Sequence, residues 1–405
     1  MKKDWEVKNL SDICEVFVDG NWIESKDQSQ NGIRLVQTGN IGFGYFKNKI
    51  DKARYVSEDT FKRLKCTEIF PNDILTSRLP DPVGKSCLIP NINSKMITGV
   101  DCTIIRTKKN VLPFYLLYFQ MSNQYLNEVK SMVTGTTRSR ISRKNLGLIN
   151  VPIAPINEQK RIVEKLDTCM EQIDKAIKNV EQNIQNAEDF LQSSLDNFIF
   201  NNSFSNKKMI NNLCEFNRGL TFSKIDRVEN SSFKVLRANN IHLDDYKINF
   251  EKLQFLDESK SYNESKKIRK NSVLMCISSG SKKHLGKIAF IDDHYDNYYF
   301  GGFMGQLTPL KDINPKYFFY CLKTSDFKYL IQSLTDGMGI NNLKYDSIKS
   351  FEIPTISIDK QDAVVNQIEQ TISNHDSLKL NYNQQLTSLN ELKQSILEKA
   401  FNGEL

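Results

Sequence analysis

The chain reads Val151-Pro152-Ile153 and, 202 residues later, Ile353-Pro354-Thr355. Working outward, other pairs keep the same order and nearly the same spacing: Gln159 and Gln361, Gln192-Ser193-Ser194-Leu195 and Gln394-Ser395-Ile396-Leu397, Pro113-Phe114-Tyr115 and Pro315-Lys316-Tyr317, and, 200 residues apart, Val36-Gln37-Thr38-Gly39-Asn40-Ile41 and Leu236-Arg237-Ala238-Asn239-Asn240-Ile241. Because one spacing accounts for matches along most of the 405 residues, we interpret the chain as a tandem duplication of a two-part unit.

Charge follows the same period. Residues 1–150 hold 23 basic and 15 acidic side chains, a net of +8, and residues 201–350 hold 23 and 16, a net of +7. The segments that follow them, 151–200 and 351–405, hold 5 against 9 and 4 against 8, a net of −4 each. Each repeat therefore consists of a basic part and an acidic part, and the basic parts suit a polyanionic partner.

Each acidic part is predicted to be one long helix, because apolar or small residues recur every three or four positions. The first series is Ile162, Leu166, Cys169, Ile173, Ile177, Val180, Ile184, Ala187, Leu191, Ser194 and Phe198. The second is Val364, Ile368, Ile372, His375, Leu378, Tyr382, Leu386, Leu389, Leu392, Ile396 and Ala400. Asn157 and Asp359 are the expected N-caps. A narrow stripe needs a partner helix, and we expect the other copy, packed antiparallel; an outside protein is the alternative.

The basic parts have the pattern of mixed α/β globules. Strands are predicted at 33–37, 73–76, 102–106, 234–237, 272–277 and 287–291, and helices near 113–130 and 315–334. The expected fold class is therefore α+β: two similar mixed α/β globular domains, separated by two long helices that form an antiparallel coiled coil, with a pseudo-twofold internal repeat. The expected boundaries are 1–152, 153–203, 204–354 and 355–405.

The sequence offers no recognisable catalytic or metal-binding pattern. Its eight cysteines and four histidines are scattered, without a CxxC pair or an HExxH motif, so no metal site is predicted. Gly280 to Lys287 departs from the phosphate-loop spacing, and Asn314-Pro315-Lys316-Tyr317 lacks the second proline of an amino-methyltransferase motif. Neither a signal peptide nor an apolar run long enough to span a bilayer is recognised, so we expect a cytoplasmic protein that does not interact with membranes.

Loops of the basic parts carry groups that suit DNA, because Arg and Lys neutralise phosphate while Arg, Asn and Gln bond base edges. The predicted DNA-binding residues are Thr38, Asn40, Arg78, Lys85, Thr137, Arg138, Arg140, Arg143, Arg237, Asn240, Ser279, Lys282, Lys283, Asn341, Asn342 and Lys344. Asn40 and Asn240 also suit a role as turn formers, which we favour for them, since Asn tolerates left-handed backbone angles. The loops differ between the repeats, as expected if each read a different sequence.

The junctions 151–159 and 352–361, and the C-terminal run 392–405, resemble those of the specificity (S) subunit of Type I restriction–modification systems. The second junction departs from the usual Pro-x-x-Glu-Gln form at Ser357 and Lys360. The resemblance covers nearly the whole chain, and its order of globule, helix, globule and helix is the same.

The resemblance implies a non-catalytic subunit whose two globules are target recognition domains, each reading one half of a bipartite, asymmetric site in double-stranded DNA. The helix pair would be the spacer and would dock two methyltransferase (modification) subunits. S-adenosylmethionine would belong to those partners, and ATP and Mg to restriction/translocase subunits, leaving no cofactor in this chain. The alternatives are a divergent DNA methyltransferase and a non-catalytic protein-interaction scaffold.

Overall fold

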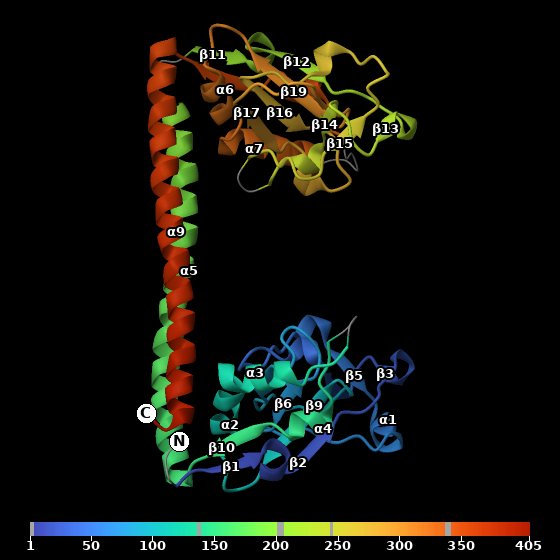
Figure 1. Cartoon of the computed structure of the whole chain (residues 1–405), viewed down its shortest axis with the longest axis vertical. Coiled ribbons are helices and arrows are strands. Elements are labelled where there is room, and N and C mark those ends of the chain that lie inside the picture. The colour runs from blue at the N-terminus through green and yellow to red at the C-terminus, as the bar shows by residue number, and fades with distance from the viewer. Residues whose placement is uncertain (1–3, 136–138, 201–205, 244–245, 337–341) are drawn as a thin grey trace. The chain divides into compact units, whose positions relative to one another are not determined.

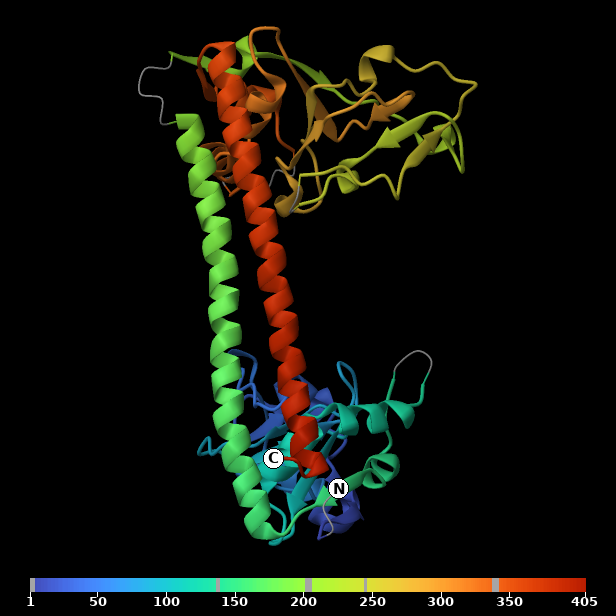
Figure 2. The ribbon, with the colours of Figure 1, turned by 60° about the vertical axis from the view of Figure 1, so that its left-hand side comes forward.

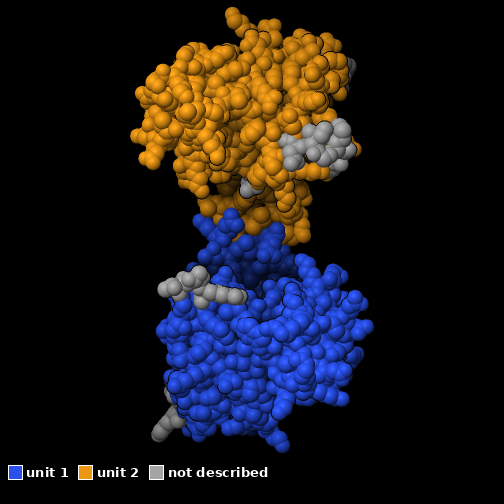
Figure 3. All heavy atoms as spheres, turned by 90° about the vertical axis from the view of Figure 1, so that its right-hand side faces the viewer, with its two compact units in different colours: residues 1–181, 383–405 blue, residues 182–382 orange. Residues whose placement is uncertain are grey.

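The computed structural model of this chain describes residues 4–135, 139–200, 206–243, 246–336 and 342–405. They form two compact units (Figure 3): unit 1 is residues 1–181 with 383–405, and unit 2 is residues 182–382. Two long helices, α5 (Ile156–Phe200) and α9 (Ile358–Asn402), contribute one segment to each unit. The long helices predicted from the apolar stripes are thus confirmed (Figure 1).

Unit 1 contains three small sheets with strand orders β1-β10, β2-β9-β6-β7 and β3-β5-β4-β8. Only the β4–β8 pair is parallel among these described strands. The strands are β1 (Glu6–Asn9), β2 (Cys14–Asp19), β3 (Gln28–Ser29), β4 (Ile33–Val36), β5 (Arg54–Val56), β6 (Ile74–Ser77), β7 (Ser86–Leu88), β8 (Met96–Thr98), β9 (Cys102–Thr107) and β10 (Asn150–Ile153), with helices α1 (Glu58–Arg63), α2 (Pro113–Gln120), α3 (Asn123–Ser131) and α4 (Arg143–Gly147).

Unit 2 repeats these sheets strand for strand, in the orders β11-β20, β12-β19-β16-β17 and β13-β15-β14-β18, with β14–β18 as its parallel pair. The strands are β11 (Asn206–Met209), β12 (Cys214–Arg218), β13 (Arg227–Val228), β14 (Lys234–Leu236), β15 (Gln254–Leu256), β16 (Ser272–Cys276), β17 (Ile288–Ile291), β18 (Tyr298–Phe300), β19 (Met304–Pro309) and β20 (Glu352–Thr355), with helices α6 (Pro315–Cys321), α7 (Ser325–Asp336) and α8 (Tyr345–Ile348). The internal repeat is therefore a repeat of topology.

Each unit builds its main core around both long helices. In unit 1, Ile162, Leu166 and Met170 of α5 share a buried cluster with Leu397, Ala400 and Phe401 of α9. In unit 2, Leu195 and Ile199 of α5 share one with Val364, Val365 and Ile368 of α9. Opposite ends of the two helices thus meet in each core, so the segments run antiparallel, as expected (Figure 2).

Polar contacts along the helix pair show the same direction. In unit 1, Arg161 donates to the carbonyl of Leu405, and Lys393 pairs with Asp174 at 2.7 Å. In unit 2, Lys379 pairs with Glu188 at 2.6 Å, and His375 lies on the seam with its side chain 8% exposed. The predicted stripe of α9 is wrong at Leu378 and Leu392, which are exposed. A 3.6-residue period drifts off a narrow seam, so regular spacing alone does not keep a residue buried.

The start of each long helix is fastened to its globule by a buried glutamine. Gln159 Oε1 accepts from the backbone N of Leu112 at 2.9 Å, and its Nε2 donates to the carbonyls of Asn110 at 3.0 Å and Ala154 at 2.8 Å. Gln361 makes the same three bonds 202 residues later, with the N of Asn314 and the carbonyls of Asp312 and Ile356. We call these two sets of bonds the glutamine clamps.

A buried tyrosine adds a fourth bond beside each clamp. The hydroxyl of Tyr115 donates to the carbonyl of Pro152 at 2.8 Å, and that of Tyr317 to the carbonyl of Pro354 at 3.0 Å. Both rings are fully buried, so these tyrosines belong to the core. The helices themselves begin at Ile156 and Ile358, one residue before the predicted caps, because the carbonyls of Pro155 and Ser357 already accept helical bonds.

We expect Gln159→Ala to destabilise unit 1 by about 1–3 kcal/mol, because it removes three hydrogen bonds to the backbone, of which the bond to the carbonyl of Ala154 is buried and those to residues 110 and 112 are part-buried. Denaturant titration of the full chain, followed by its tyrosine and tryptophan signals, measures this loss. Gln182→Ala is the matched control: its amide is exposed and, among the described residues, bonds Asn186 on the same helix, so a change within about 0.5 kcal/mol is expected. Equal losses for the two variants would contradict the clamp.

Candidate nucleic-acid interface

The predicted DNA-binding residues fall into three groups in the structure. Arg140, Arg143, Lys282, Lys283, Asn342 and Lys344 are exposed, Thr38, Lys85, Arg237 and Ser279 are half-buried, and Asn40, Arg78 and Asn240 are buried. Thr137, Arg138 and Asn341 lie outside the described residues. The exposed and half-buried residues are accessible to a ligand, whereas the buried ones make hydrogen bonds and ion pairs within the fold.

The side chain of Arg78 is buried and forms an internal ion pair, so it is not a surface cation. Its side chain is 5% exposed, its Nε lies 3.2 Å from Asp19 Oδ1, and its Nη2 donates to the carbonyl of Val100 at 2.6 Å. Burial lowers the pKa of the guanidinium, and the neighbouring Asp19 opposes that shift. The sequence predicts Arg78 as a surface residue that contacts DNA. In the structure its ion pair with Asp19 joins the end of β2 to the end of β6, and its guanidinium is used inside the fold.

Asn40 and Asn240 close equivalent turns. Asn40 Oδ1 accepts from the backbone N of Gln37 at 3.0 Å, and Asn240 Oδ1 accepts from that of Arg237 at 2.8 Å. Their Nδ2 groups donate to the carbonyls of Lys47 and Asn249, both at 2.8 Å. The amides are thus used within the fold, which agrees with their interpretation as turn formers.

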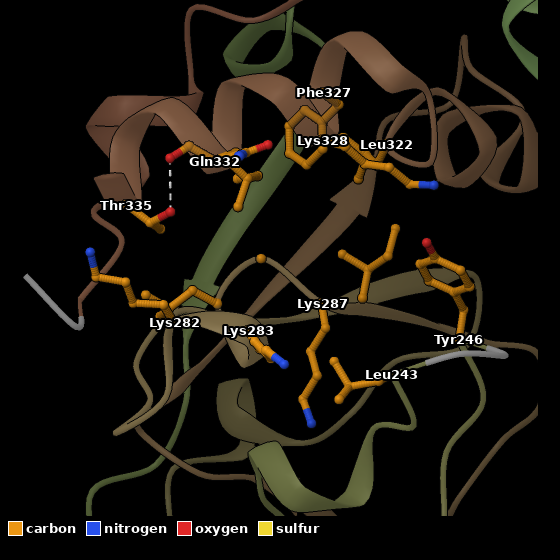
Figure 4. A pocket seen from close by; sticks show the side chains of 14 residues that line it. Leu243, Tyr246, Lys282, Lys283, Lys287, Leu322, Phe327, Lys328, Gln332 and Thr335 are labelled. Atoms are coloured by element: carbon orange, nitrogen blue, oxygen red, sulfur yellow. Dashed lines mark hydrogen bonds between the residues drawn. The ribbon is translucent and has the colours of Figure 1, made fainter. Parts of the chain in front are cut away.

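A basic pocket of 420 Å³ in unit 2 gathers two of the predicted lysines (Figure 4). Lys282 and Lys283 line one side of the pocket, and Gln332 and Thr335 of α7 line the opposite side. Lys287 and Lys328 also line it, and the predicted set omitted both. Lys287 Nζ donates to the carbonyl of Ile241 at 2.7 Å, and burial lowers its pKa. Gly286-Lys287 lies 202 residues after Gly84-Lys85, so the repeat itself could have identified Lys287.

Two clefts occupy equivalent places in the two units, and each is lined by one predicted residue and several missed ones. The unit 1 cleft measures 190 Å³ and includes Thr38, together with Trp22, Gln37 and Asp101. The unit 2 cleft measures 540 Å³ and includes Arg237, together with Arg218, Arg227 and Phe303. Segments far apart in the sequence meet in each cleft because the parallel pairs β4–β8 and β14–β18 bring them together.

Within the described ranges, no group of three or more His, Cys, Asp or Glu side chains could hold a metal ion. Nor is any helix of the described residues both long enough and apolar enough to cross a bilayer. The exposed and half-buried residues of the predicted DNA-binding set carry cationic, hydroxyl and amide side chains, which suit a polyanion.

Comparisons with known proteins agree on one family. The sequence model described as "Type I restriction modification DNA specificity domain" matches residues 2–184 and 203–388. The chain is 26% identical over 406 residues to the Type I restriction enzyme EcoKI specificity subunit of Escherichia coli strain K12, and 28% identical over 411 residues to the StySPI specificity subunit of Salmonella potsdam. Each alignment covers 94% of this chain and 85% of the relative.

Solved structures show the same fold at low identity. One, from a study titled "Structural basis underlying complex assembly and conformational transition of the type I R-M system", has a TM-score of 0.77 at 16% identity and covers 100% of this chain and 99% of its own. The crystal structure of the HsdS subunit from Thermoanaerobacter tengcongensis has a TM-score of 0.54 at 16% identity, covering 100% and 98%.

We expect Arg78→Ala to lower the free energy of unfolding of unit 1 by about 1–3 kcal/mol, since it removes the ion pair with Asp19, which keeps only its bond from Thr103 among the described residues, and the bond to the carbonyl of Val100. Arg143→Ala, at an exposed position of the same unit, is expected to change it by less than about 0.5 kcal/mol. Denaturant titration of both variants separates the internal arginine from the surface one. An unchanged free energy of unfolding for Arg78→Ala would show that the ion pair between Arg78 and Asp19 does not stabilise the unit.

Proposed function

The chain belongs to the family of type I restriction modification DNA specificity proteins, and from this we infer how its two halves divide the task of reading DNA. It is a specificity subunit, a non-catalytic DNA-recognition subunit of a type I restriction–modification system. We propose that residues 1–152 and 204–354 are target recognition domains, each reading one half of a bipartite, asymmetric site in double-stranded DNA. We also propose that it acts in the cytoplasm.

The observation that carries this proposal is one scaffold presented twice with different surfaces. The sheets of the two units have the same strand order, yet Gln37 in one cleft corresponds to Arg237 in the other. Side chains at groove-facing tips decide which base edges can be bonded, whereas the scaffold only positions them. Two domains with the same sheet order but different cleft side chains would therefore read two different half-sites.

We propose that residues 153–203 and 355–405, which contain α5 and α9, act as spacer and docking scaffold. A repeated acidic helix pair presents two similar surfaces, which suits two methyltransferase (modification) subunits. Restriction/translocase subunits would join the complex through those partners. S-adenosylmethionine would be bound by the methyltransferase subunits, and ATP and Mg by the motor subunits, so we assign no cofactor to this chain.

We expect DNA affinity to fall steeply with salt, and Arg140→Ala and Arg143→Ala each to reduce the slope of log K against log [salt] by about one unit, because each removes a phosphate contact. Fluorescence anisotropy with a labelled duplex, between about 50 and 200 mM salt, measures this slope. The modification subunits are included, so that a chain that binds only when clamped by its partners is also detected.

Lys175→Ala is the control, since this exposed lysine lies on α5, which contains none of the predicted DNA-binding residues. Its slope should equal that of the wild type. Unchanged slopes for both arginine variants, with folding intact, would contradict the placement of phosphate contacts at residues 140 and 143.

The two half-sites would be separated by base pairs that neither domain contacts, which we call the unread gap. We expect four residues inserted into both long helices to lengthen this gap by about two base pairs and to leave both half-sites unchanged, because four helical residues add about 6 Å. Asp174 faces Lys393 and Glu188 faces Lys379, so the midway positions Glu181 and Leu386 face one another. Insertion after each of them keeps the two helices in step.

Sequencing of methylated adenines in a host that carries the variant complex would show the new gap. Insertion into α5 alone is the matched control: it shifts one helix against the other and is expected to abolish site-specific methylation. Altered half-sites with an unchanged gap would contradict the role of the helices as spacer.

A further inference from the structure

The two clefts share one backbone frame. The N of Gly20 donates to the carbonyl of Cys102 at 2.9 Å, and the N of Gly219 donates to that of Met304 at 3.0 Å. At both glycines the chain passes so close to the neighbouring strand that a Cβ would lie 2.2 Å from a carbonyl oxygen, that of Thr98 or of Gly301. Only glycine fits so close a backbone approach. The clefts can therefore be compared position by position.

Their linings differ in charge at these matched positions. Gln37 corresponds to Arg237, since the backbone N of each bonds the asparagine that closes the next turn. Asp101 corresponds to Phe303, since their carbonyls accept from the N of Arg78 and of Ile277 at 2.9 Å each. The unit 1 lining contains Asp101 and no Arg or Lys, whereas the unit 2 lining contains three arginines and no Asp or Glu.

A third matched pair explains how Arg218 becomes available in unit 2. Asp19 precedes Gly20 as Arg218 precedes Gly219. In unit 1 the carboxylate of Asp19 is paired with Arg78, but the counterpart of Arg78 is the buried Ile277. Among the residues that the structure describes, Arg218 therefore has no acidic partner at the place where unit 1 has an internal ion pair. It lines the cleft instead, held by one bond from its Nε to the carbonyl of Gly302 at 3.0 Å.

The other two arginines also make contacts that hold them in place without using all of their N–H donors. Arg237 Nη2 donates to the carbonyl of Lys252 at 3.4 Å, while its buried Nε has no hydrogen-bond partner among the described residues. The guanidinium of Arg227 lies 5.4 Å from the centre of the Phe222 ring. Because a guanidinium has five N–H donors in a fixed fork, these contacts orient the groups and leave donors for a ligand.

The hydrogen-bonding groups on the edges of the bases suggest which base would suit each cleft lining. Arginine bonds O6 and N7 of guanine as a bidentate pair, whereas Gln and Asp bond the exocyclic amino groups of adenine and cytosine. Phe303, 66% exposed at the cleft, adds an apolar surface that suits a base or a thymine methyl and that a phosphate site would not need. Resting on the proposed function, we propose that the unit 2 cleft selects guanine in its half-site and the unit 1 cleft selects an amino-bearing base, adenine or cytosine.

Arg237→Gln tests the proposal, because it installs the unit 1 residue in the unit 2 cleft. The full chain, assembled with its modification subunits, is used to select duplexes from a randomised pool. The wild type is expected to enrich a bipartite site with guanine in one half. Arg237→Gln should lower the preference for one guanine by about tenfold or more, in that half alone.

Gln37→Arg is the reciprocal variant and decides the matter if Arg237→Gln binds no DNA. It should make the other half-site prefer guanine where the wild type selects adenine or cytosine. Arg269→Gln is the matched control, since this exposed arginine of unit 2 pairs with Glu215 outside the cleft, and both half-sites should stay unchanged.

Three results would overturn the inference. One is an unchanged consensus with weaker binding and a smaller salt slope for Arg237→Gln, which would mark Arg237 as a phosphate contact. Another is a consensus that changes in both halves. The third is a Gln37→Arg variant that binds DNA with the wild-type consensus. If the wild-type complex itself enriches no sequence, the proposed function fails, and that outcome is distinct from all three.

Discussion

The bonds of one buried amide at the start of each long helix determine how that helix leaves its globule. A helix can space two surfaces only if its direction from each of them is constant. In both repeats a glutamine one turn into the helix bonds a loop of the globule and the strand end before the helix, and a tyrosine hydroxyl bonds the same junction. The glutamine bond to Ala154 and both tyrosine bonds are buried and the others are part-buried, so breaking a buried one leaves a desolvated backbone group unpaired. That cost makes a single junction geometry strongly preferred.

A constant junction and a constant sheet order allow the cleft linings to vary. The cleft residues that differ in charge between the units, Gln37 and Asp101 against Arg218, Arg227, Arg237 and Phe303, belong to none of the hydrophobic core clusters. The pair Asp19 and Arg78 shows the principle: unit 1 forms an internal ion pair there, whereas unit 2 has a different residue at both positions, Arg218 and the buried Ile277. Replacing both members of a buried pair is far less costly than removing one, so such positions change together.

The sequence predicted periodic features well and failed where burial depends on distant residues. The duplication, the fold class and the two long helices could be predicted because identity and apolar spacing recur over many residues. Arg78 was misplaced because a charge in a polar run gives no sign of the carboxylate 59 positions earlier that neutralises it. The clefts were missed except at Thr38 and Arg237, since each is assembled from segments joined only by a parallel strand pair.

The same shared cores tie the two repeats together as the chain folds. The ring of Phe401 packs against Tyr115 and Phe119 of α2, with ring centres 5.2 and 5.3 Å away. The core of unit 1 therefore stays incomplete until α9 has been made. Burial of aromatic side chains is among the largest contributions to a core, so the first repeat gains its full stability only when the second has been synthesised. Although its scaffold is duplicated, the protein folds as one interleaved chain.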